Sequence, residues 1–201
     1  MIEKGLFVTI DGPNGVGKTS ICNGVADRLT CKGLKIFRTQ EPTNSSLGKF
    51  IRQAERDYNG RTLACLVAAD RYFHLDHKIG QELQKGKIVL CARYVESSLV
   101  LQRFDKLKLE FIWQLNSQIT IPDLSIILTA PPKILKERLS KRDIYSRFEE
   151  VMSRTLELQY YRDAVNFLSG KGFNFVIIEN SNTPLDSNIN RITKQILNLI
   201  Q

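Results

Sequence analysis

An eight-residue stretch near the N-terminus constrains the fold more than any other part of the chain. Gly12-Pro13-Asn14-Gly15-Val16-Gly17-Lys18-Thr19 matches G-x-x-x-x-G-K-[ST], the pattern of the phosphate-binding P-loop. The apolar run Leu6–Ile10 before it is typical of a strand, and Ser20–Leu29 after it is typical of a helix. This order places backbone N–H groups and the positive end of a helix around bound phosphates. We therefore predict a nucleoside triphosphate site that extends through Ser20.

Two side chains of this stretch have the chemistry that the site requires. Lys18 offers a mobile positive charge for the β- and γ-phosphates, and the Thr19 hydroxyl suits Mg²⁺. The sequence thus predicts that Mg²⁺ binds together with ATP, with Thr19 as its protein ligand.

Five short apolar runs, separated by helical patterns, indicate a mostly parallel sheet with both faces covered. Right-handed crossovers between such strands give a doubly wound α/β domain, and ligands then bind beyond the carboxyl ends of the strands. The chemistry is therefore expected in loops 11–19, 39–46, 92–98, 129–132 and 179–184. The five runs are Leu6–Ile10, Lys35–Arg38, Ile88–Cys91, Leu124–Leu128 and Asn174–Ile178.

Three helical patterns stand out in the rest of the chain. One runs from Arg61 to Lys85 and stops at Gly86, and a second runs from Arg147 to Leu168 without an evident break. The last repeats its apolar residues on one face, with Asp186 or Ser187 as its expected cap. The apolar residues of that last helix are Ile189, Ile192, Ile196 and Leu199.

Length and composition fit one soluble domain. The chain has 201 residues, 42% of them hydrophobic, and no apolar run approaches the roughly 20 residues of a membrane span. Its four cysteines are scattered, which indicates reduced thiols in a cytoplasmic protein, two of them buried. The net charge of +8 is compatible with polyphosphates or nucleic acid, but the sequence shows no basic stripe interleaved with aromatic residues.

Two further features each allow more than one interpretation. The charge-rich segment 133–147 is either a solvated helix face or a mobile lid that brings cations over transferring phosphates. His74 and His77 lie three residues apart on an expected helix, but no third metal ligand stands at a suitable spacing. We interpret both histidines as surface or dimer-face residues.

Several stretches, taken together in order and spacing, resemble the thymidylate kinase family over essentially the whole chain, as a single domain spanning residues 1–201. The resemblance implies the three-layer P-loop kinase fold, a homodimer, and phosphoryl transfer from ATP to a nucleoside monophosphate. The matching stretches are Thr39–Pro42, Leu47–Arg52, Ala68–Arg71, Gly86–Ser98, Pro122–Leu124, Pro131–Pro132 and Arg147–Glu149.

The resemblance also implies roles for individual residues. Arg52, Arg71 and Arg93 would hold the acceptor phosphate, since guanidinium groups bind phosphate oxygens in pairs. Glu41 would organise these arginines, although each arginine could instead form a structural ion pair with Asp70, Glu41 or Glu96. Asn14 and Val67 would line the acceptor site, Ser98 and Gln102 would face its base, and Arg142 or Arg147 would supply the lid cation.

Five positions depart from the family pattern. Ala92 stands where an Asp usually precedes Arg-Tyr, and a methyl group can neither hold Mg²⁺ through water nor assist the attacking oxygen. Val67 replaces a Phe that stacks on the base, and Asn14 replaces an acidic residue near the sugar. Gln40 replaces an Arg, and Thr129 stands where an Asp often ends the fourth strand.

The departures leave two functions open. Because the ATP loop is intact and most changes touch the acceptor side, the chain is expected to phosphorylate dTMP or a related pyrimidine deoxynucleotide. Alternatively, the loss of the carboxylate at Ala92 leaves a nucleotide-binding protein with little turnover. Lys18, Mg²⁺ and the arginines favour the first, because phosphoryl transfer depends mainly on positioning and electrostatic stabilisation.

Overall fold

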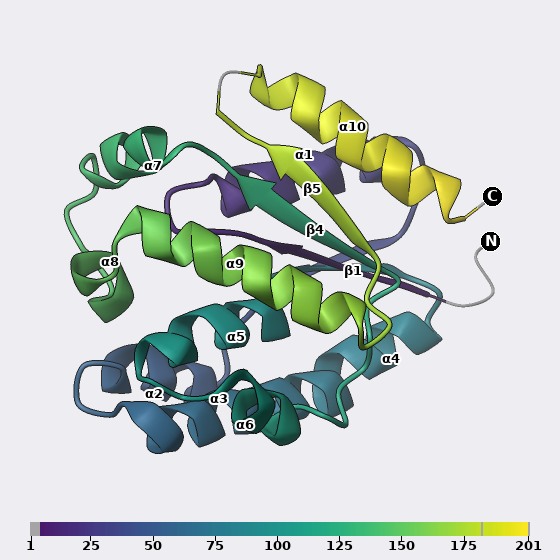
Figure 1. Ribbon diagram of the computed structural model, residues 1–201. Helices are drawn as coiled ribbons and strands as arrows, with labels where there is room; N and C mark the ends of the chain where they lie inside the picture. Colours follow the sequence, from purple (N-terminus) through teal and green to yellow (C-terminus); the bar gives the residue numbers. More distant parts are fainter. Residues whose placement is uncertain (1–4, 182, 201) are drawn as a thin grey trace.

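A parallel five-stranded sheet forms the centre of the molecule in the computed structural model, which describes residues 5–181 and 183–200 (Figure 1). Its strands lie in the order β2-β3-β1-β4-β5, and all four neighbouring pairs are parallel. The predicted α/β class with helices on both faces is therefore confirmed. The strands are β1 (Leu6–Asp11), β2 (Ile36–Gln40), β3 (Ile88–Ala92), β4 (Leu124–Thr129) and β5 (Phe175–Glu179).

The sheet's position between two layers explains the composition of its strands. All six residues of β1 are buried, because alternate side chains enter different apolar clusters on the two faces. Val8 and Ile10 belong to one cluster, and Phe7 belongs to the other. A strand that is apolar on both faces reads as a continuous hydrophobic run, which is how the sequence revealed it.

Helices α1 (Lys18–Cys31) and α10 (Leu185–Asn198) cover one face of the sheet (Figure 1). Their apolar stripes meet, and Ile189 of α10 lies against Gly24 of α1, where an added Cβ would approach the isoleucine methyl to 2.3 Å. This contact holds α1 in place behind the P-loop.

The opposite face is covered by α5 (Val95–Phe104), α9 (Arg154–Ser169) and a long helical segment. That segment consists of α3 (Gly60–His74), a π-helical turn η1 (Leu75–Ile79) and α4 (Gly80–Gln84), so the predicted helix from Arg61 to Lys85 is confirmed. Helices α2 (Ser46–Ala54) and α6 (Leu109–Leu115) pack outside this layer. Helix α7 (Pro132–Leu139) follows β4.

The prediction of one continuous helix from Arg147 to Leu168 is wrong in one respect. The helix is interrupted after α8 (Arg147–Val151), and a second helix follows. Met152 is extended, and the Ser153 side chain accepts a hydrogen bond from Leu156 N–H and so begins α9. The Ser153 cap outweighs the apolar spacing that made the two helices read as one.

The expected cap of the last helix is also wrong. Pro184 precedes the first helical residue, and its carbonyl accepts a hydrogen bond from Ser187 N–H. Asp186 lies in the first turn and pairs with Arg28 at 2.7 Å, where its charge favours the helix dipole. Leu199, which the periodicity placed on the core face, is 42% exposed because the helix ends at Asn198.

One expectation from composition agrees with the fold. Cys22 of α1 and Cys91 of β3 are buried, whereas Cys31 and Cys65 are exposed, and all four are free. Across residues 5–181 and 183–200, no helix is long and apolar enough to cross a membrane.

Candidate nucleotide site

The P-loop connects β1 to α1, and its backbone has positive φ at three glycines, Gly12, Gly15 and Gly17. Gly12 has φ +142°, and a Cβ there would lie 2.3 Å from the carbonyl oxygen of Leu128. Gly17, with φ +95°, immediately precedes α1. The loop therefore directs the N-terminus of a 14-residue helix towards the cavity described below.

Lys18 is folded back onto the loop that precedes it. Its Nζ donates hydrogen bonds to the carbonyl oxygens of Gly12 at 2.6 Å and Pro13 at 2.9 Å. Burial and the nearby positive charge of Arg93 lower the pKa of Lys18 to about 7, against the opposing effects of Asp11 and Glu157. A bound polyphosphate would restore the charge of this lysine.

A cavity of about 620 Å³ joins the P-loop to the loops that follow β2 and β3. Three of the five strand-end loops expected to hold the chemistry line it: 11–19, 39–46 and 92–98. It brings together all eight residues predicted for the acceptor site and several from the P-loop. The acceptor-site residues are Asn14, Glu41, Arg52, Val67, Arg71, Arg93, Ser98 and Gln102; the other P-loop residues are Gly15, Gly17, Lys18, Thr19 and Ser20.

Arg71 lies at the inner wall of this cavity, only 1% exposed, with its guanidinium bound by protein groups. Its Nε donates to Glu41 Oε2 at 2.8 Å, and its terminal nitrogens donate to the side chains of Asn116 and Ser98. Arg71 thus both forms a structural ion pair with Glu41 and lines the cavity, although the sequence analysis treated these two roles as alternatives. Asn116, after α6, was not anticipated, because 45 residues separate it from Arg71.

Arg52 and Arg93 occupy different positions from Arg71. Arg52 donates to the carbonyl oxygens of Pro42 and Thr43 and forms no ion pair with a carboxylate in the part of the chain that the structure describes. Arg93 donates to Asn14 Oδ1 at 2.5 Å and to Ser97 Oγ at 3.2 Å. Its φ of +68° is left-handed, a conformation that costs a non-glycine residue about 1–3 kcal/mol and is typical of functional sites.

The far end of the cavity has apolar walls and one unsatisfied polar atom. Val67 lines it together with Leu63, Leu101 and Phe148. Gln102 is 3% exposed, and its Oε1 has no hydrogen-bond partner among the residues that the structure describes. A buried acceptor without a partner indicates a place for a ligand N–H.

The segment predicted as a lid divides into two parts. Residues 132–139 form α7, and an irregular stretch then leads over the cavity, which Arg142 and Tyr145 line. Arg142 pairs with Glu149 at 2.7 Å and is half exposed. Arg147 does not line the cavity, because it forms an ion pair with Asp105 beyond α5.

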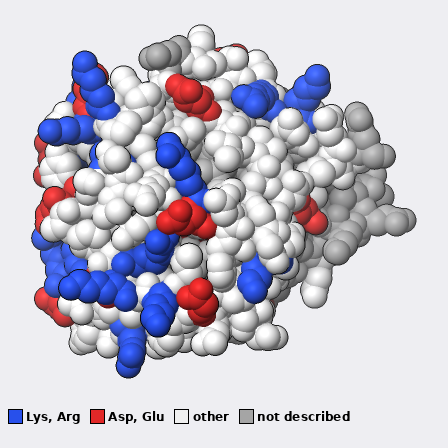
Figure 2. Space-filling view, viewed as in Figure 1, with Lys and Arg blue, Asp and Glu red and all other residues white. Residues whose placement is uncertain are grey.

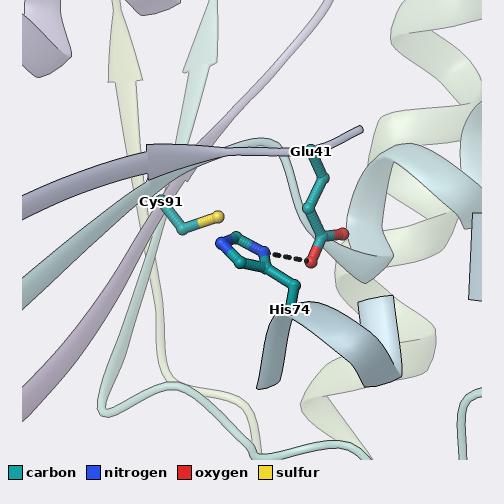
Figure 3. A group of neighbouring side chains, drawn as sticks. All are labelled: Glu41, His74 and Cys91. Atoms are coloured by element: carbon teal, nitrogen blue, oxygen red, sulfur yellow. Dashed lines mark hydrogen bonds and ion pairs between the residues drawn. The ribbon is translucent and has the colours of Figure 1, made fainter. Parts of the chain in front are cut away.

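The interpretation of His74 as a surface residue is wrong, whereas His77 is exposed as expected. His74 is 1% exposed; its Nδ1 lies 3.2 Å from Glu41 Oε1 and its Nε2 lies 2.6 Å from the Thr39 hydroxyl. Figure 3 shows Cys91 of β3 completing a group with Glu41 and His74, whose ligand atoms all lie within 4.8 Å of one another. No spacing along the sequence could reveal this group.

The Glu41–His74–Cys91 group is better explained as support for the cavity wall than as a metal site. Both oxygens of Glu41 and both nitrogens of His74 already have partners, and burial raises the pKa of the Cys91 thiol well above its usual value. His74 therefore orients Glu41, and Glu41 orients Arg71.

Sequence reasoning missed three residues that hold the P-loop and its surroundings. Asp11 is fully buried and accepts hydrogen bonds from the N–H groups of Gly12 and Ser97 and from the Tyr161 hydroxyl. Glu157 of α9 accepts from the N–H of Asn14, and Arg138 of α7 donates to the carbonyl of Asn180 after β5. Of the three, only Asp11 had a local signal, because it directly precedes the motif.

Comparison with known proteins agrees with this geometry. The family model for thymidylate kinase matches residues 10–192. A probable thymidylate kinase of Caldivirga maquilingensis is 33% identical over 202 residues, covering 98% of this chain and 93% of the relative. One from Methanococcus maripaludis is 32% identical with 96% of each chain covered, and a thymidylate kinase of Shouchella clausii is 37% identical over 72% of each. The chain therefore belongs to the thymidylate kinase family.

Proposed function

We propose that this protein transfers the γ-phosphoryl group of ATP to the 5′-phosphate of dTMP or a closely related pyrimidine deoxynucleotide. The observation that supports this most directly is the shared cavity. The P-loop lysine lines the same space as Arg52 and Arg93, which have no carboxylate partner among residues 5–181 and 183–200. A donor triphosphate on the loop and an acceptor phosphate on the arginines would then meet in one cavity. Relatives named thymidylate kinases support the choice of acceptor.

Mg²⁺ fits the donor half through a single protein ligand. Thr19 is exposed and lines the cavity, so its hydroxyl is free to bind a metal carried by the triphosphate. Glu41, a carboxylate that lines the cavity, has both oxygens bound by Arg71 and His74. Mg²⁺ keeps most of its ligands from phosphate and water in such sites, and when bound it neutralises developing charge.

In the acceptor half, we assign the phosphate to Arg52 and Arg93 and the base to the inner wall. Arg71 suits the base end better than the phosphate end, because it donates to Ser98, the residue expected to face the base. The free Oε1 of Gln102 would accept the ring N–H of a thymine or uracil. Val67 contributes apolar contact in place of aromatic stacking.

Transfer requires no covalent enzyme intermediate. An oxygen of the acceptor phosphate would attack the γ-phosphorus in line, and the bond to the bridging oxygen of ADP would break. Lys18 and Arg142, which both line the cavity, would offset the charge on the transferring group. The Arg93 guanidinium would hold the attacking phosphate beside the P-loop.

A coupled assay of ADP release with a panel of nucleoside monophosphates tests this proposal. We expect turnover with dTMP at about 1–100 s⁻¹, as in other kinases. Lys18→Ala should lower kcat by at least about 100-fold, because it removes the charge nearest the donor phosphates. Absence of acceptor-dependent ADP formation with every monophosphate would overturn the proposal.

A second candidate is a nucleotide-binding protein with little turnover, which Ala92 at the cavity wall favours. It predicts that ATP raises the melting temperature while no ADP forms. Nucleic-acid binding has less support, since Figure 2 shows Lys and Arg interspersed with Asp and Glu on the face it presents. We further propose a homodimer in the cytoplasm, on the basis of the family and the four free cysteines.

A further inference from the structure

Glu157 is a buried carboxylate that reaches the P-loop from a distant helix. It lies in α9, is 0% exposed, and accepts the N–H of Asn14 at its Oε1 over 2.9 Å. Its Oε2 accepts from Arg154, one helical turn earlier, at 2.7 Å. The backbone amide of Asn14, the third residue of the phosphate-binding motif, is therefore directed at the protein rather than at a nucleotide.

Asn14 extends this contact to the acceptor arginine. Its side-chain Oδ1 accepts from Arg93 Nη2, so one residue is bound through its backbone by Glu157 and through its side chain by Arg93. Asn14 is only 3% exposed, which leaves water little access to either bond. Any rotation of the Asn14 backbone would therefore move the Arg93 guanidinium.

The same chain of contacts continues to the wall of the cavity. Arg154 is 8% exposed and donates to the carbonyl oxygens of Phe148, at 3.2 Å, and Met152, at the end of α8. Phe148 lines the apolar end of the cavity. Arg154 and Glu157 therefore join the α8 wall to the loop that holds Arg93.

We propose that Glu157 is a positioning residue for phosphoryl transfer, which fixes the Asn14 amide and, through Asn14, the Arg93 guanidinium. The inference rests on the proposed kinase activity. Without an acceptor at position 157, the buried Asn14 N–H would lose its partner, and the loop would shift to recover one. Displacement of a catalytic group by about 1 Å can lower a rate by 100-fold. If Glu157 served only to neutralise Arg154, its loss would affect folding stability alone.

Two paired variants separate these roles. Arg154→Gln with Glu157→Gln removes both charges but keeps an oxygen that can accept the Asn14 N–H. Arg154→Met with Glu157→Met keeps similar volumes and removes the acceptor; replacing both members of a buried ion pair avoids leaving one charge unpaired. We expect kcat with dTMP to be at least about 10-fold lower in the methionine pair than in the glutamine pair, with KM for ATP nearly equal.

Two controls identify the route of the effect. Asp163→Asn also removes a carboxylate of α9 with an arginine partner, Arg103 at 2.9 Å, but this pair faces α5, and kcat should stay within about 2-fold. In an Arg93→Lys background, the difference between the two pairs should shrink to less than about 3-fold, because Glu157 acts through Arg93. Unfolding midpoints, measured separately, ensure that all variants are assayed while folded.

The outcomes distinguish this inference from the proposed function. Equal kcat for the two pairs in an active enzyme, or an undiminished difference in the Arg93→Lys background, would overturn the positioning role alone. If the wild type shows no turnover, the proposed function fails. The role of Glu157 is then tested by measuring the affinity of each variant for dTMP by calorimetry instead of kcat. The methionine pair should then bind dTMP more weakly than the glutamine pair, and equal affinities would refute the role of Glu157.

Discussion

At the scale of single residues, we expect Lys18 to make nucleotide binding depend on pH. In the free protein its pKa is lowered to about 7 by burial and by Arg93, so a growing fraction is neutral above that pH. Phosphates bind the charged form and raise the pKa again. We expect the dissociation constant of MgATP to be constant below pH 7 and to rise about 10-fold per pH unit above it.

Calorimetric titration between pH 6 and pH 9 measures this dependence, and buffers of different ionisation enthalpy report the proton taken up. Lys18→Arg is the matched variant, because a guanidinium stays charged over the whole range. Its ATP affinity should change little with pH. An equally steep dependence in Lys18→Arg would show that another group is responsible.

The raised pKa of Glu96 leads to a second prediction, which concerns how the free energy of unfolding depends on pH. Burial and the charge of Asp11 raise its pKa to about 7, and its Oε2 has no partner among the residues that the structure describes. Between about pH 4.5 and 7 the unfolded chain has released this proton while the folded protein retains it, so the free energy of unfolding falls as pH rises.

Glu96→Gln resembles the protonated form and should remove this contribution. At pH 8 we expect the variant to be more stable than wild type by about 1–3 kcal/mol, and at pH 5 the two should be nearly equal. Urea unfolding at both pH values provides the measurement. A stability difference that does not change with pH would contradict the prediction.

A substitution at Ala92 tests whether the missing carboxylate limits turnover. Ala92 ends β3, is partly buried and lines the cavity, with Arg93 as the next residue. An aspartate here could hold a water of Mg²⁺, so Ala92→Asp should raise kcat by about 10-fold if that role is vacant. Ala92→Asn, similar in shape but uncharged, is the control. Equal rates in wild type and Ala92→Asp would mean that other residues already serve this purpose.

At the scale of secondary-structure elements, the two lid arginines should respond differently to mutation. Arg142 lines the cavity from an irregular stretch, whereas Arg147 begins α8 and pairs with Asp105 after α5. Arg142→Met should lower kcat by about 10–100-fold with little change in stability, because it removes charge beside the transferring group. Arg147→Met should lower the unfolding midpoint more than kcat.

Steady-state kinetics and thermal unfolding of the same two proteins give the comparison. The methionine side chain preserves much of the apolar length of arginine, so loss of packing contributes equally to both variants. A larger kcat loss in Arg147→Met than in Arg142→Met would contradict this prediction and would indicate that Arg147 supplies the catalytic cation.

The secondary-structure elements also show how much of the fold could be predicted from the sequence. The five strands and the P-loop were predictable, because each is encoded by a local pattern: an apolar run of strand length, or a motif with fixed spacing. The break at Ser153 was not, since apolar periodicity continues across it and only the Ser153 cap interrupts it. The residues predicted for the acceptor site came from the family resemblance, and all of them line one cavity.

The contacts that support the site depend on tertiary structure and had no local signal. His74 contacts Thr39 and Glu41 from 35 and 33 residues away, and Glu157 contacts Asn14 from 143 residues away. A helical histidine or glutamate with ordinary neighbours reads as a surface residue, because the sequence does not show which strand-end loop its helix will pack against.

At the scale of the whole molecule, the remaining prediction is association of two copies. Helix α3 places the large apolar side chain of Phe73 on the surface at 40% exposure, with its ring centroid 4.6 Å from that of the tilted His77 ring of η1. If the proposed homodimer forms through this helix, light scattering should give a solution mass of twice 23.0 kDa. Phe73→Glu would bring two carboxylates together across such a two-fold interface and should yield monomer at the same concentration.

Phe50 of α2 provides the matched control, because it is 44% exposed but lies on a different helix. Phe50→Glu should leave the dimer intact. A monomeric wild type would exclude the dimer directly, and a dimer unaffected by Phe73→Glu would place the interface on another surface. Because Arg71 and His74 belong to the same helix as Phe73, a dimer through α3 would also stiffen the inner wall of the cavity. The Phe73→Glu monomer should therefore show a higher KM for dTMP, by about 3–10-fold, with KM for ATP nearly unchanged.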